Sequence, residues 1–150
     1  MATGLKLEMS QVMGGGFLKT EEALEGVDSV LLFAAGSGIS PLRSVIESQV
    51  LKGKDVSLYY GAQTPAQMAY QEKFAEWEAL GVSVTPVISK SDGTDWSGAT
   101  GYVQDVCEAA GVSTPASTAV LLCGMKGMAE GVKEMASKVG IPEEKVYNNF

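Results

Sequence analysis

An apolar run that leads directly into a glycine turn is the feature that most limits how this chain folds. Residues 30–35 are all apolar and are followed by the sequence Gly36-Ser37-Gly38-Ile39-Ser40-Pro41. Six consecutive apolar residues are typical of a strand buried on both faces of a parallel sheet. Gly36 and Gly38 permit a sharp turn with positive φ. Ser40 and Pro41 are typical of a helix cap and a first helical residue, so we expect strand, turn and helix in that order.

This junction also has the properties of a phosphate-binding site. The first N–H groups of a helix have no acceptor within the helix, and the helix dipole is positive at that end. Together they favour an anion such as a phosphate group. A Gly-x-Gly sequence is a weak signal by itself, because a tight strand-to-helix turn without a ligand explains it equally well. Both interpretations stay open at this point.

Strand-like and helix-like segments alternate along the rest of the chain. Besides residues 29–35, the apolar patterns predict four strands: 56–60, 82–88, 118–123 and 145–150. Helices are predicted from Ser40 to about Lys52, after a capping box at Thr64–Gln67, and around apolar stripes that begin at Val103 and Met128. This alternation predicts an α/β fold, a doubly wound five-stranded parallel sheet with helices on both faces. The polar segment from Ser89 to Ala99 is predicted to be a loop.

The first part of the chain differs from this regular pattern. In residues 1–26, apolar and charged side chains alternate over a few positions, as in a short strand, before a glycine-rich stretch. An isolated strand does not bury its apolar face, so this arm is expected to dock on the domain or on a partner. The predicted organisation is therefore an N-terminal arm, 1–26, and one domain, 27–150.

Composition excludes several classes of function. The net charge of −7 argues against nucleic acid or an anionic membrane as the main partner, because both require clustered basic surface. The chain has no histidine and two cysteines, Cys107 and Cys123, which excludes Ser-His-Asp triads, Cys-His dyads and tetrahedral zinc sites. The cysteine pair favours two packed thiols over a disulfide. No apolar run has the roughly 20 residues of a membrane span, and no signal or transit sequence is recognisable at the start of the chain.

Three predicted strands end in small or polar residues: Gly36-Ser37-Gly38, Gly61-Ala62-Gln63 and Cys123-Gly124-Met125. In a doubly wound sheet, ligands bind beyond the carboxyl ends of the strands, so we expect these ends to converge. The usual dinucleotide fingerprint is absent in two respects. Pro41 occupies the place of its third glycine, and the second strand ends without an acidic residue for a ribose.

The motifs resemble those of the ferredoxin–NADP reductase superfamily over residues 27–150. They include the specific string 123–128, Cys-Gly-Met-Lys-Gly-Met, and the sequences at 60–62 and 101–104. Within that superfamily the chain looks most like plant and algal plastid oxidoreductases of the kiwifruit fruit-protein type, judging from residues 10–17, 68–74 and 149–150. Members combine an N-terminal flavin-binding barrel with a C-terminal NAD(P) domain, and only the second is recognisable here.

The resemblance implies a role for individual residues. The turn Gly36–Pro41 would hold the pyrophosphate, Tyr102 would stack on the adenine, and Cys123 would lie near the hydride path. Phe150 would be the aromatic residue that covers the flavin ring. The implied cofactor-binding residues are Gly36, Ser37, Gly38, Ser40, Pro41, Gly61, Ser89, Lys90, Tyr102, Gly124 and Met125, and the implied catalytic residues are Cys123 and Phe150.

Each role has a purely structural alternative. Tyr102 is also compatible with a half-buried helix residue, Cys123 with a small buried apolar residue, and Phe150 with a packed terminal strand.

The sequence also departs from the family pattern. Gln63 and Thr100 stand where members often carry basic residues, which removes bidentate partners for a 2′-phosphate. Ser89 and Lys90 remain, so the pattern indicates a modest preference for NADH over NADPH. Asn148 replaces the glutamate of ferredoxin-linked members, which argues against ferredoxin exchange. The Arg-x-Tyr-Ser/Thr flavin motif has no counterpart, so FAD is expected only with an additional flavin-binding domain.

Three functions follow from these observations. The first is the NAD(P)H-binding half of a flavin-dependent oxidoreductase, which passes hydride to a flavin held by another domain or by a partner protein. That partner could be part of a multi-subunit complex. The second is a non-catalytic structural or regulatory subunit that retains the reductase fold. The third, a generic nucleotide- or FMN-binding domain, leaves Cys123-Gly124 and the terminal aromatic residue unexplained. By resemblance alone, the expected location is the chloroplast.

Overall fold

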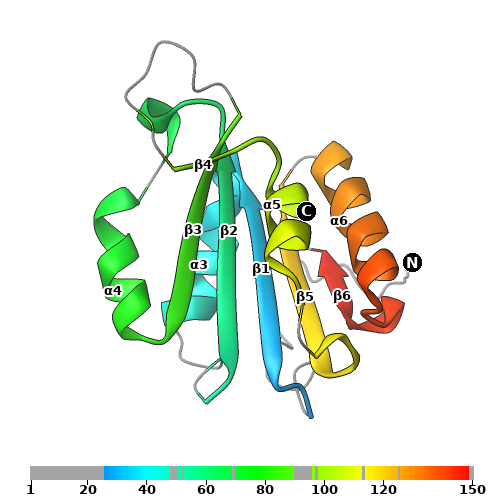
Figure 1. Ribbon diagram of the computed structural model, residues 1–150. Coiled ribbons are helices and arrows are strands. Elements are labelled where there is room, and N and C mark those ends of the chain that lie inside the picture. Colours follow the sequence, from blue (N-terminus) through cyan, green and yellow to red (C-terminus); the bar gives the residue numbers. More distant parts are fainter. Residues whose placement is uncertain are drawn as a thin grey trace, which may run out of the picture.

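Parallel strands form the centre of the computed structural model, and helices cover both faces of the sheet (Figure 1). The structure describes residues 26–47, 51, 53–68, 70–89, 96, 98–112, 114–124 and 126–148. Within these residues the sheet has six strands in the order β4-β3-β2-β1-β5-β6, and every neighbouring pair is parallel. The strands are β1 Ser29–Ala35, β2 Asp55–Ala62, β3 Val82–Ile88, β4 Ala99–Thr100, β5 Thr118–Cys123 and β6 Val146–Asn148.

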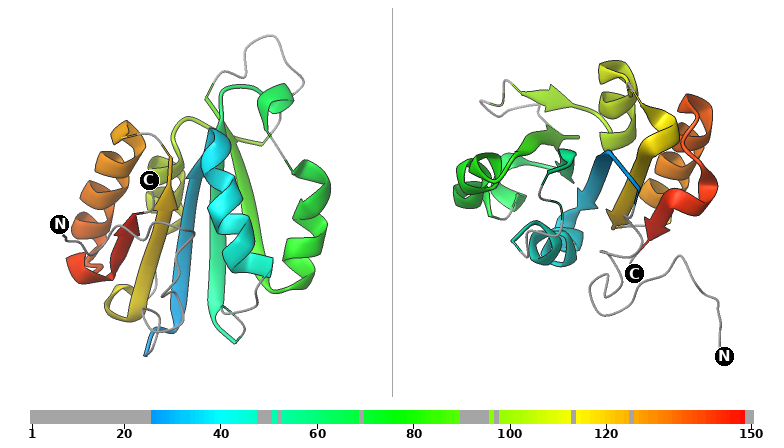
Figure 2. Two further views of the ribbon diagram at one scale, coloured as in Figure 1. Left: turned by 180° about the vertical axis from the view of Figure 1, so that it is seen from behind. Right: turned by 90° about the horizontal axis from the view of Figure 1, so that it is seen from below.

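Four α-helices and five short 3-10 turns connect these strands in the described part of the chain. The helices are α3 Ile39–Glu47, α4 Phe74–Ala79, α5 Val103–Ala110 and α6 Lys126–Val139. The 3-10 turns are η1 Gly36–Gly38, η2 Pro65–Gln67, η3 Gln71–Lys73, η4 Pro115–Ser117 and η5 Glu143–Lys145. Seen along the sheet, α3 and α4 lie on one side and α5 and α6 on the other (Figure 2).

The apolar run before the glycine turn forms the middle of the sheet. Residues 30–34 are buried, and β1 pairs with β2 on one side and β5 on the other. Side chains of successive residues point to opposite faces of the sheet. Leu32 therefore packs with α3 and α4, and Phe33 packs with α5 and α6. The run thus contributes to two separate apolar cores, as a strand buried on both faces must.

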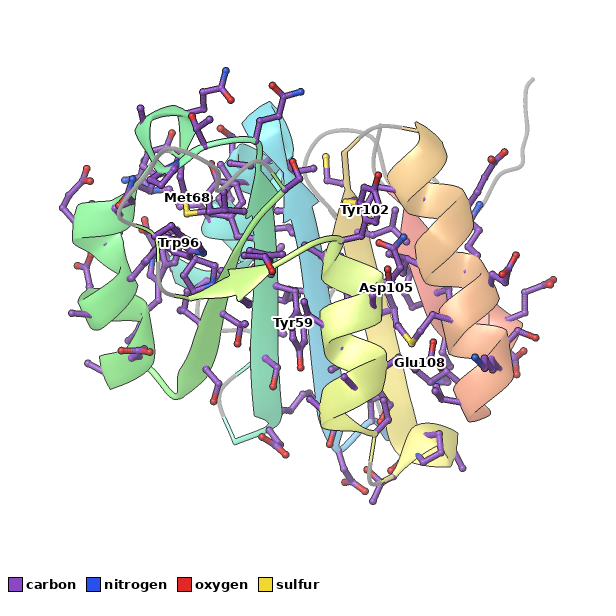
Figure 3. All side chains as sticks on the ribbon, turned by 45° about the horizontal axis from the view of Figure 1, so that its top comes forward. Tyr59, Met68, Trp96, Tyr102, Asp105 and Glu108 are labelled. Atoms are coloured by element: carbon purple, nitrogen blue, oxygen red, sulfur yellow. The ribbon has the colours of Figure 1, made fainter. Side chains whose placement is uncertain are left out.

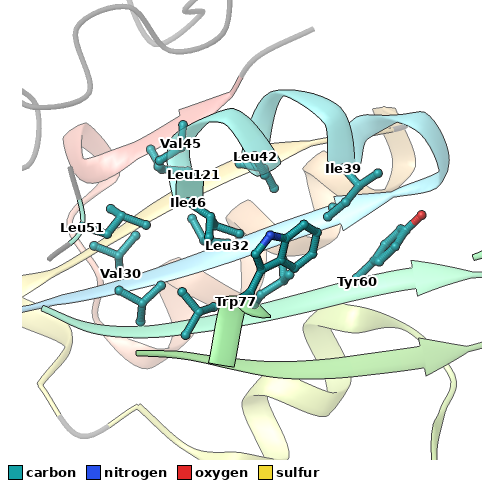
Figure 4. Packing of buried hydrophobic residues seen from close by; sticks show 14 of the residues in the cluster. Val30, Leu32, Ile39, Leu42, Val45, Ile46, Leu51, Tyr60, Trp77 and Leu121 are labelled. Carbon is teal, nitrogen blue, oxygen red and sulfur yellow. The ribbon is translucent and has the colours of Figure 1, made fainter. Parts of the chain in front are cut away.

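The core on the α3 side is organised around Trp77 of α4. Its side chain is fully buried among apolar residues of β1 and α3 (Figure 4). The indole N–H donates a hydrogen bond of 3.1 Å to the carboxylate of Glu47, at the end of α3. A buried indole N–H requires such a partner. This contact ties α4 to α3 as well as to the sheet.

The predicted fold class is confirmed, with one additional strand. The α/β class, the parallel pairing and the two-sided helix cover are as expected, and the five predicted strands are all present. The sixth strand, β4, lies where a loop was expected. Its two residues pair with Val87 and Ile88 of β3. The strand therefore depends on this pairing, and no local sequence pattern predicts it.

Two predicted helix starts are wrong. Ser40 is not the cap of α3 but its second residue, because the 3-10 turn Gly36–Gly38 continues directly into the helix. Thr64 does not cap a long helix either. Its side chain makes no cap hydrogen bond, and Pro65–Gln67 is a single 3-10 turn. Gln71 donates hydrogen bonds to the carbonyl groups of Pro65 and Met68, so this segment folds back on itself and α4 begins only at Phe74.

The predicted N-terminal arm lies almost wholly outside the described residues, and its docking stays a prediction. The domain boundary at residue 27 likewise stays a prediction. Among the residues that the structure describes, no helix has the length and apolar character needed to span a bilayer.

Candidate functional site at the carboxyl edge of the sheet

The strand order places the predicted site residues in one row. At the carboxyl edge, Ala35 of β1 pairs with Gly61 of β2, and Ala34 pairs with Cys123 of β5. On the far side, Ile88 of β3 pairs with Ala62 and with Thr100 of β4. The chain runs outward from β1 to β4 and then crosses back to β5 on the other side of β1. The change of strand order therefore lies beside β1, where ligands of doubly wound sheets bind.

The glycine turn after β1 is packed between the ends of β2 and β5. Gly36 has φ +57, which a glycine adopts readily. A Cβ built on Gly38 would overlap the carbonyl oxygen of Cys123 and lie 2.6 Å from its carbonyl carbon. The Tyr60 hydroxyl donates to the carbonyl of Gly36 over 3.4 Å. Gly38 is thus required by the close approach of two backbones, and this approach joins the glycine turn to the predicted nicotinamide end.

The other two glycines of the row are also in close contact with neighbouring segments. A Cβ on Gly61 would lie 3.0 Å from a methyl group of Val103, at the start of α5. One on Gly124 would lie 3.2 Å from the Cβ of Ala35 and 2.7 Å from the Met128 side chain. The three predicted strand ends therefore converge, as the sequence indicated.

Tyr102 is the most exposed part of this row. Its side chain is 65% exposed, and it precedes α5 at the same edge as the end of β5 (Figure 3). The adjacent N–H of Gly101 donates to the carbonyl of Ile88 over 3.1 Å, which holds the segment at the end of β3. The alternative interpretation, a half-buried helix residue, is wrong. An exposed aromatic ring of this kind is available for stacking on a planar ligand.

Ser89 lies in the same row. Its N–H donates to the carbonyl of Ala62 over 3.0 Å, and its side chain is exposed. Four further features implied by the resemblance fall outside the described part of the chain: Lys90, Met125, Phe150 and the side chain of Ser37. Their roles stay predictions.

Cys123 ends β5 with only 7% of its surface exposed. Burial raises the pKa of its thiol, so the group is protonated at neutral pH. Such a thiol is a small packing group at the edge of the site and not an activated nucleophile. A role beside the hydride path does not require a thiolate, so this prediction is unaffected. Both cysteines are free and buried, as expected.

A group of side chains beside the glycine turn was not anticipated. The guanidinium of Arg43 lies 4.8 Å from the centre of the Tyr70 ring. Ser40 and Arg43 belong to α3, whereas Tyr70 precedes η3. The sequence predicts a helix after the capping box at Thr64–Gln67, and no local signal in it places Tyr70 beside Arg43 of α3.

A cavity of the molecule lies away from the carboxyl edge of the sheet. A cavity of about 500 Å³ lies among α6, η5 and β6, lined by Lys133, Ala136, Ser137, Ile141, Glu143, Glu144 and Val146. The connection from α6 to β6 lies at the amino ends of these parallel strands, away from the glycine turn. In the described part of the chain, no group of three or more cysteine or acidic side chains is arranged so that it could hold a metal ion.

Comparison with known proteins agrees with this geometry. Residues 32–134 match the family model of the oxidoreductase NAD-binding domain. The fruit protein pKIWI502 of Actinidia deliciosa is 39% identical over 145 residues, which cover 93% of this chain and 45% of that protein. One component of the Na(+)-translocating NADH-quinone reductase of Serratia proteamaculans is 26% identical over 97% of this chain and 37% of its own length. The chain thus spans less than half of these two relatives.

Solved structures show the same fold. The ferredoxin NADP+ reductase of Neisseria gonorrhoeae, with bound FAD and NADP, superposes with a TM-score of 0.72 and 18% identity, over 85% of this chain and 58% of that one. The fold is that of the NAD(P)-binding half of such reductases. The family match shows that the chain belongs to the oxidoreductase NAD-binding domain family, and its fold is like that of the ferredoxin NADP+ reductase.

Proposed function

We propose that this chain binds NAD(P)H along the carboxyl edge of its sheet and presents the nicotinamide to a flavin held by another domain or partner. The observation that carries the proposal is the contact between the Gly36–Gly38 turn and the Cys123–Gly124 backbone. It puts a helix N-terminus suited to phosphate beside a strand end made of small residues. An extended dinucleotide requires both within reach of each other.

The row of residues supports one orientation of the ligand. Tyr102 and Ser89 stand at the β3 and β4 side of the edge, so the adenosine would lie there, with Tyr102 stacked on the adenine. The glycine turn in the middle would receive the pyrophosphate. The nicotinamide would then lie over Cys123 and Gly124. Bound NAD(P)H supplies the hydride, and the chain supplies position and the exclusion of water.

Within this proposal, NADH is the preferred cofactor. In the described part of the row, Gln63 and Thr100 replace basic residues that would bind a 2′-phosphate with paired hydrogen bonds. Calorimetric titration with NADH and NADPH tests this point. NADH should bind more tightly, and a clear preference for NADPH would contradict it.

Two exposed side chains provide a matched test of nucleotide binding. Tyr102→Ala removes the stacking ring, and we expect it to weaken binding of ADP about fivefold to a hundredfold, since base stacking contributes about 1–3 kcal/mol. Tyr102→Phe keeps the ring and should retain most of the affinity. Leu80→Ala is the control, because Leu80 is also a large exposed apolar residue, 43% exposed, but follows α4. Unchanged ADP binding by Tyr102→Ala would contradict the orientation.

The hydride acceptor needs a separate test. The coverage of the relatives supports a flavin-binding segment in the same polypeptide or in a partner, including a larger multi-subunit complex. When the chain is assayed with its flavin-binding segment, rapid mixing with NADH should bleach the flavin absorbance. Nucleotide binding without flavin reduction would instead support a non-catalytic subunit that retains the fold.

A chloroplast location is part of this proposal and rests on the resemblance to plastid oxidoreductases. The test is fluorescence microscopy of the full-length gene product fused to a fluorescent protein in plant or algal cells. Signal confined to the cytosol would contradict it.

A further inference from the structure

Trp96 is an aromatic residue close to the carboxyl end of β3 to which the proposed function gives no role. Its indole N–H donates a hydrogen bond of 2.8 Å to the carbonyl of Ala99, the first residue of β4. A Cβ built on Gly98 would lie 2.7 Å from Cζ2 of the indole and 3.0 Å from Cε2, so the ring rests on the bare backbone of that glycine. One indole therefore contacts two successive residues where β4 begins.

The contacts of Trp96 also involve both faces of the sheet. The indole packs against the core on the α3 side, whose buried members include Met68 and Ile88. Ala99, by contrast, packs against the core on the α5 side. Trp96 therefore holds the start of β4 from the face of the sheet that is opposite to α5.

β4 has few backbone contacts to keep it in place. Its two residues pair with Val87 and Ile88 of β3, and a strand of this length is shorter than usual. Beyond the strand, the N–H of Gly101 donates to the carbonyl of Ile88 over 3.1 Å. Gly101 has φ +103, which a glycine adopts readily, and it turns the chain directly into Tyr102 and α5. The position of β4 therefore depends on the side chains that fasten it.

Tyr102 lies at the far end of the same segment. Figure 3 shows Trp96 where the segment begins and Tyr102 where it enters α5. The Tyr102 side chain is 65% exposed and makes no cap hydrogen bond with α5. The place of such a ring is set mainly by its backbone, and that backbone follows β4 and Gly101.

We propose that Trp96 is a positioning residue of the adenine subsite, which fixes β4 and thereby holds Tyr102 where its ring stacks on the adenine. This inference rests on the proposed function and extends it to a residue that does not itself contact the nucleotide. The indole acts at the start of β4, the pairing with β3 fixes the strand, and Gly101 carries the constraint to Tyr102.

The first test removes the indole hydrogen bond. Trp96→Phe keeps an aromatic ring above Gly98 but has no donor for the Ala99 carbonyl. We expect it to weaken ADP binding about twofold to twelvefold, the range of one net hydrogen bond. Trp77→Phe is the matched control, because Trp77 also donates its indole N–H, to Glu47, but belongs to α4. The control should lower the free energy of unfolding without changing the ADP affinity.

A second variant moves the indole without altering it. Gly98→Ala places a methyl group against the ring of Trp96, which must shift to make room. This variant should weaken ADP binding in the same direction as Trp96→Phe. Both changes should lose their effect in a Tyr102→Ala background, because the ring that they position is then absent. Additive effects would mean that Trp96 acts on the nucleotide by another route, and would overturn the inference.

The indole N–H of Trp96 provides a readout that a purely structural role would not change. The chain contains two tryptophans, so nitrogen-15 NMR shows two indole N–H signals, and Trp77→Phe identifies that of Trp96. ADP stacked on Tyr102 should stabilise β4 and slow hydrogen exchange of this N–H, because coupling between two sites is reciprocal. Tyr102→Ala, at an ADP concentration that gives equal saturation, should lose this protection. Equal protection in both proteins would contradict the inference.

The outcomes separate this inference from the proposed function. If the wild-type chain binds neither ADP nor NADH, or if Tyr102→Ala binds ADP as well as the wild type, the proposed function or its orientation fails and this inference fails with it. If Tyr102→Ala weakens ADP binding while Trp96→Phe and Gly98→Ala do not, only the inference is overturned.

The control variant decides one further case. A loss of ADP affinity in Trp77→Phe as large as that in Trp96→Phe would also overturn the inference, since a general loss of stability would then explain both. If Trp96→Phe or Gly98→Ala does not fold, judged by circular dichroism, the exchange measurement on the wild type and Tyr102→Ala decides the question.

Discussion

At the scale of single residues, the site depends on the absence of side chains. Gly38 approaches the Cys123 carbonyl too closely for a Cβ, and Gly124 packs on Ala35. Gly36 is different, because open space surrounds its Cα and only its positive φ requires glycine. The sequence pattern treats these glycines alike, whereas the structure assigns close backbone packing to Gly38 and a turn to Gly36.

Gly38→Ala should destabilise the protein and abolish nucleotide binding. The added methyl group would overlap the backbone of Cys123, which is not free to move because β5 is paired on both sides. Overpacking of this kind costs about 1–3 kcal/mol. Urea unfolding followed by circular dichroism measures the loss, and titration with ADP measures binding. Gly127→Ala in α6 is the control, since nothing lies within 4 Å of its added Cβ. Equal stability and ADP affinity of Gly38→Ala and wild type would contradict the packing argument.

At the scale of elements, a buried polar pair joins β2 to α5. Tyr59 stacks on Phe33 with 5.4 Å between ring centres, and it shares an apolar core with Cys107 of α5. Burial raises the pKa of Cys107 from 9.0 to about 11 and that of Tyr59 from 10.0 to about 12. Both groups are therefore held in their neutral forms, and their ionisation would lower the stability of the folded chain.

The free energy of unfolding should consequently fall as the pH rises above 9. Below that value both groups are neutral in the folded and the unfolded chain, and there is no effect. Between about pH 9 and 12 the unfolded chain ionises first, so the loss grows until the folded groups ionise as well. The raised pKa of Cys107, two units above its ordinary value, alone corresponds to a loss of roughly 2–3 kcal/mol in the free energy of unfolding. Urea unfolding at several pH values measures the decline.

The comparison of variants isolates this pair from other groups. Burial also raises the pKa of Cys123 and Tyr147, which contribute to the same decline. Cys107→Ala and Tyr59→Phe should each show a shallower decline than the wild type, whatever their stability at pH 7. A slope identical to that of the wild type in both variants would show that the pair does not control stability in this range.

At the scale of the whole molecule, the carboxyl edge is suited to a nucleotide, while the chain covers less than half of the two curated relatives described above. The described residues form two apolar cores on either side of one parallel sheet, with a row of strand ends and an exposed aromatic ring at its carboxyl edge. They contain no strands outside this sheet, and so no barrel. A flavin ring is bound by the separate barrel in the family that the sequence resembles. The two cofactors should therefore behave differently toward this chain.

The 150-residue protein should not retain FAD on its own. After mixing with excess FAD and gel filtration, we expect the protein to elute without visible flavin absorbance. FMN, which lacks the adenosine part, should not bind at all, whereas ADP and NADH should bind in equilibrium titrations. Any weak binding of FAD should be displaced by ADP, because it would use the nucleotide site. Stoichiometric FAD in the eluted protein, unaffected by ADP, would contradict the assignment.

The strands and the convergence of their glycine-containing ends were predictable because their signals are local. Buried parallel strands require continuous apolar sequence, and β1 and β5 carry it. Gly36, Gly38, Gly61 and Gly124 follow strand ends, which parallel topology brings to one edge. β4 was not predictable, since its two residues become a strand only by pairing with β3. The starts of α3 and α4 were misplaced because 3-10 turns took the place of the side-chain caps that the sequence suggested.

What the sequence by itself determined was therefore the class of fold, the order of its elements and the position of the glycine turn, since each depends on neighbouring residues. Only the tertiary structure decided which groups surround that turn. The ring of Tyr70, whose backbone is left-handed, lies 4.8 Å from the guanidinium of Arg43, and Gly38 is required by a carbonyl 85 residues further along the chain. Contacts between segments so far apart depend on how β1, β2 and β5 pack, and no local pattern encodes them.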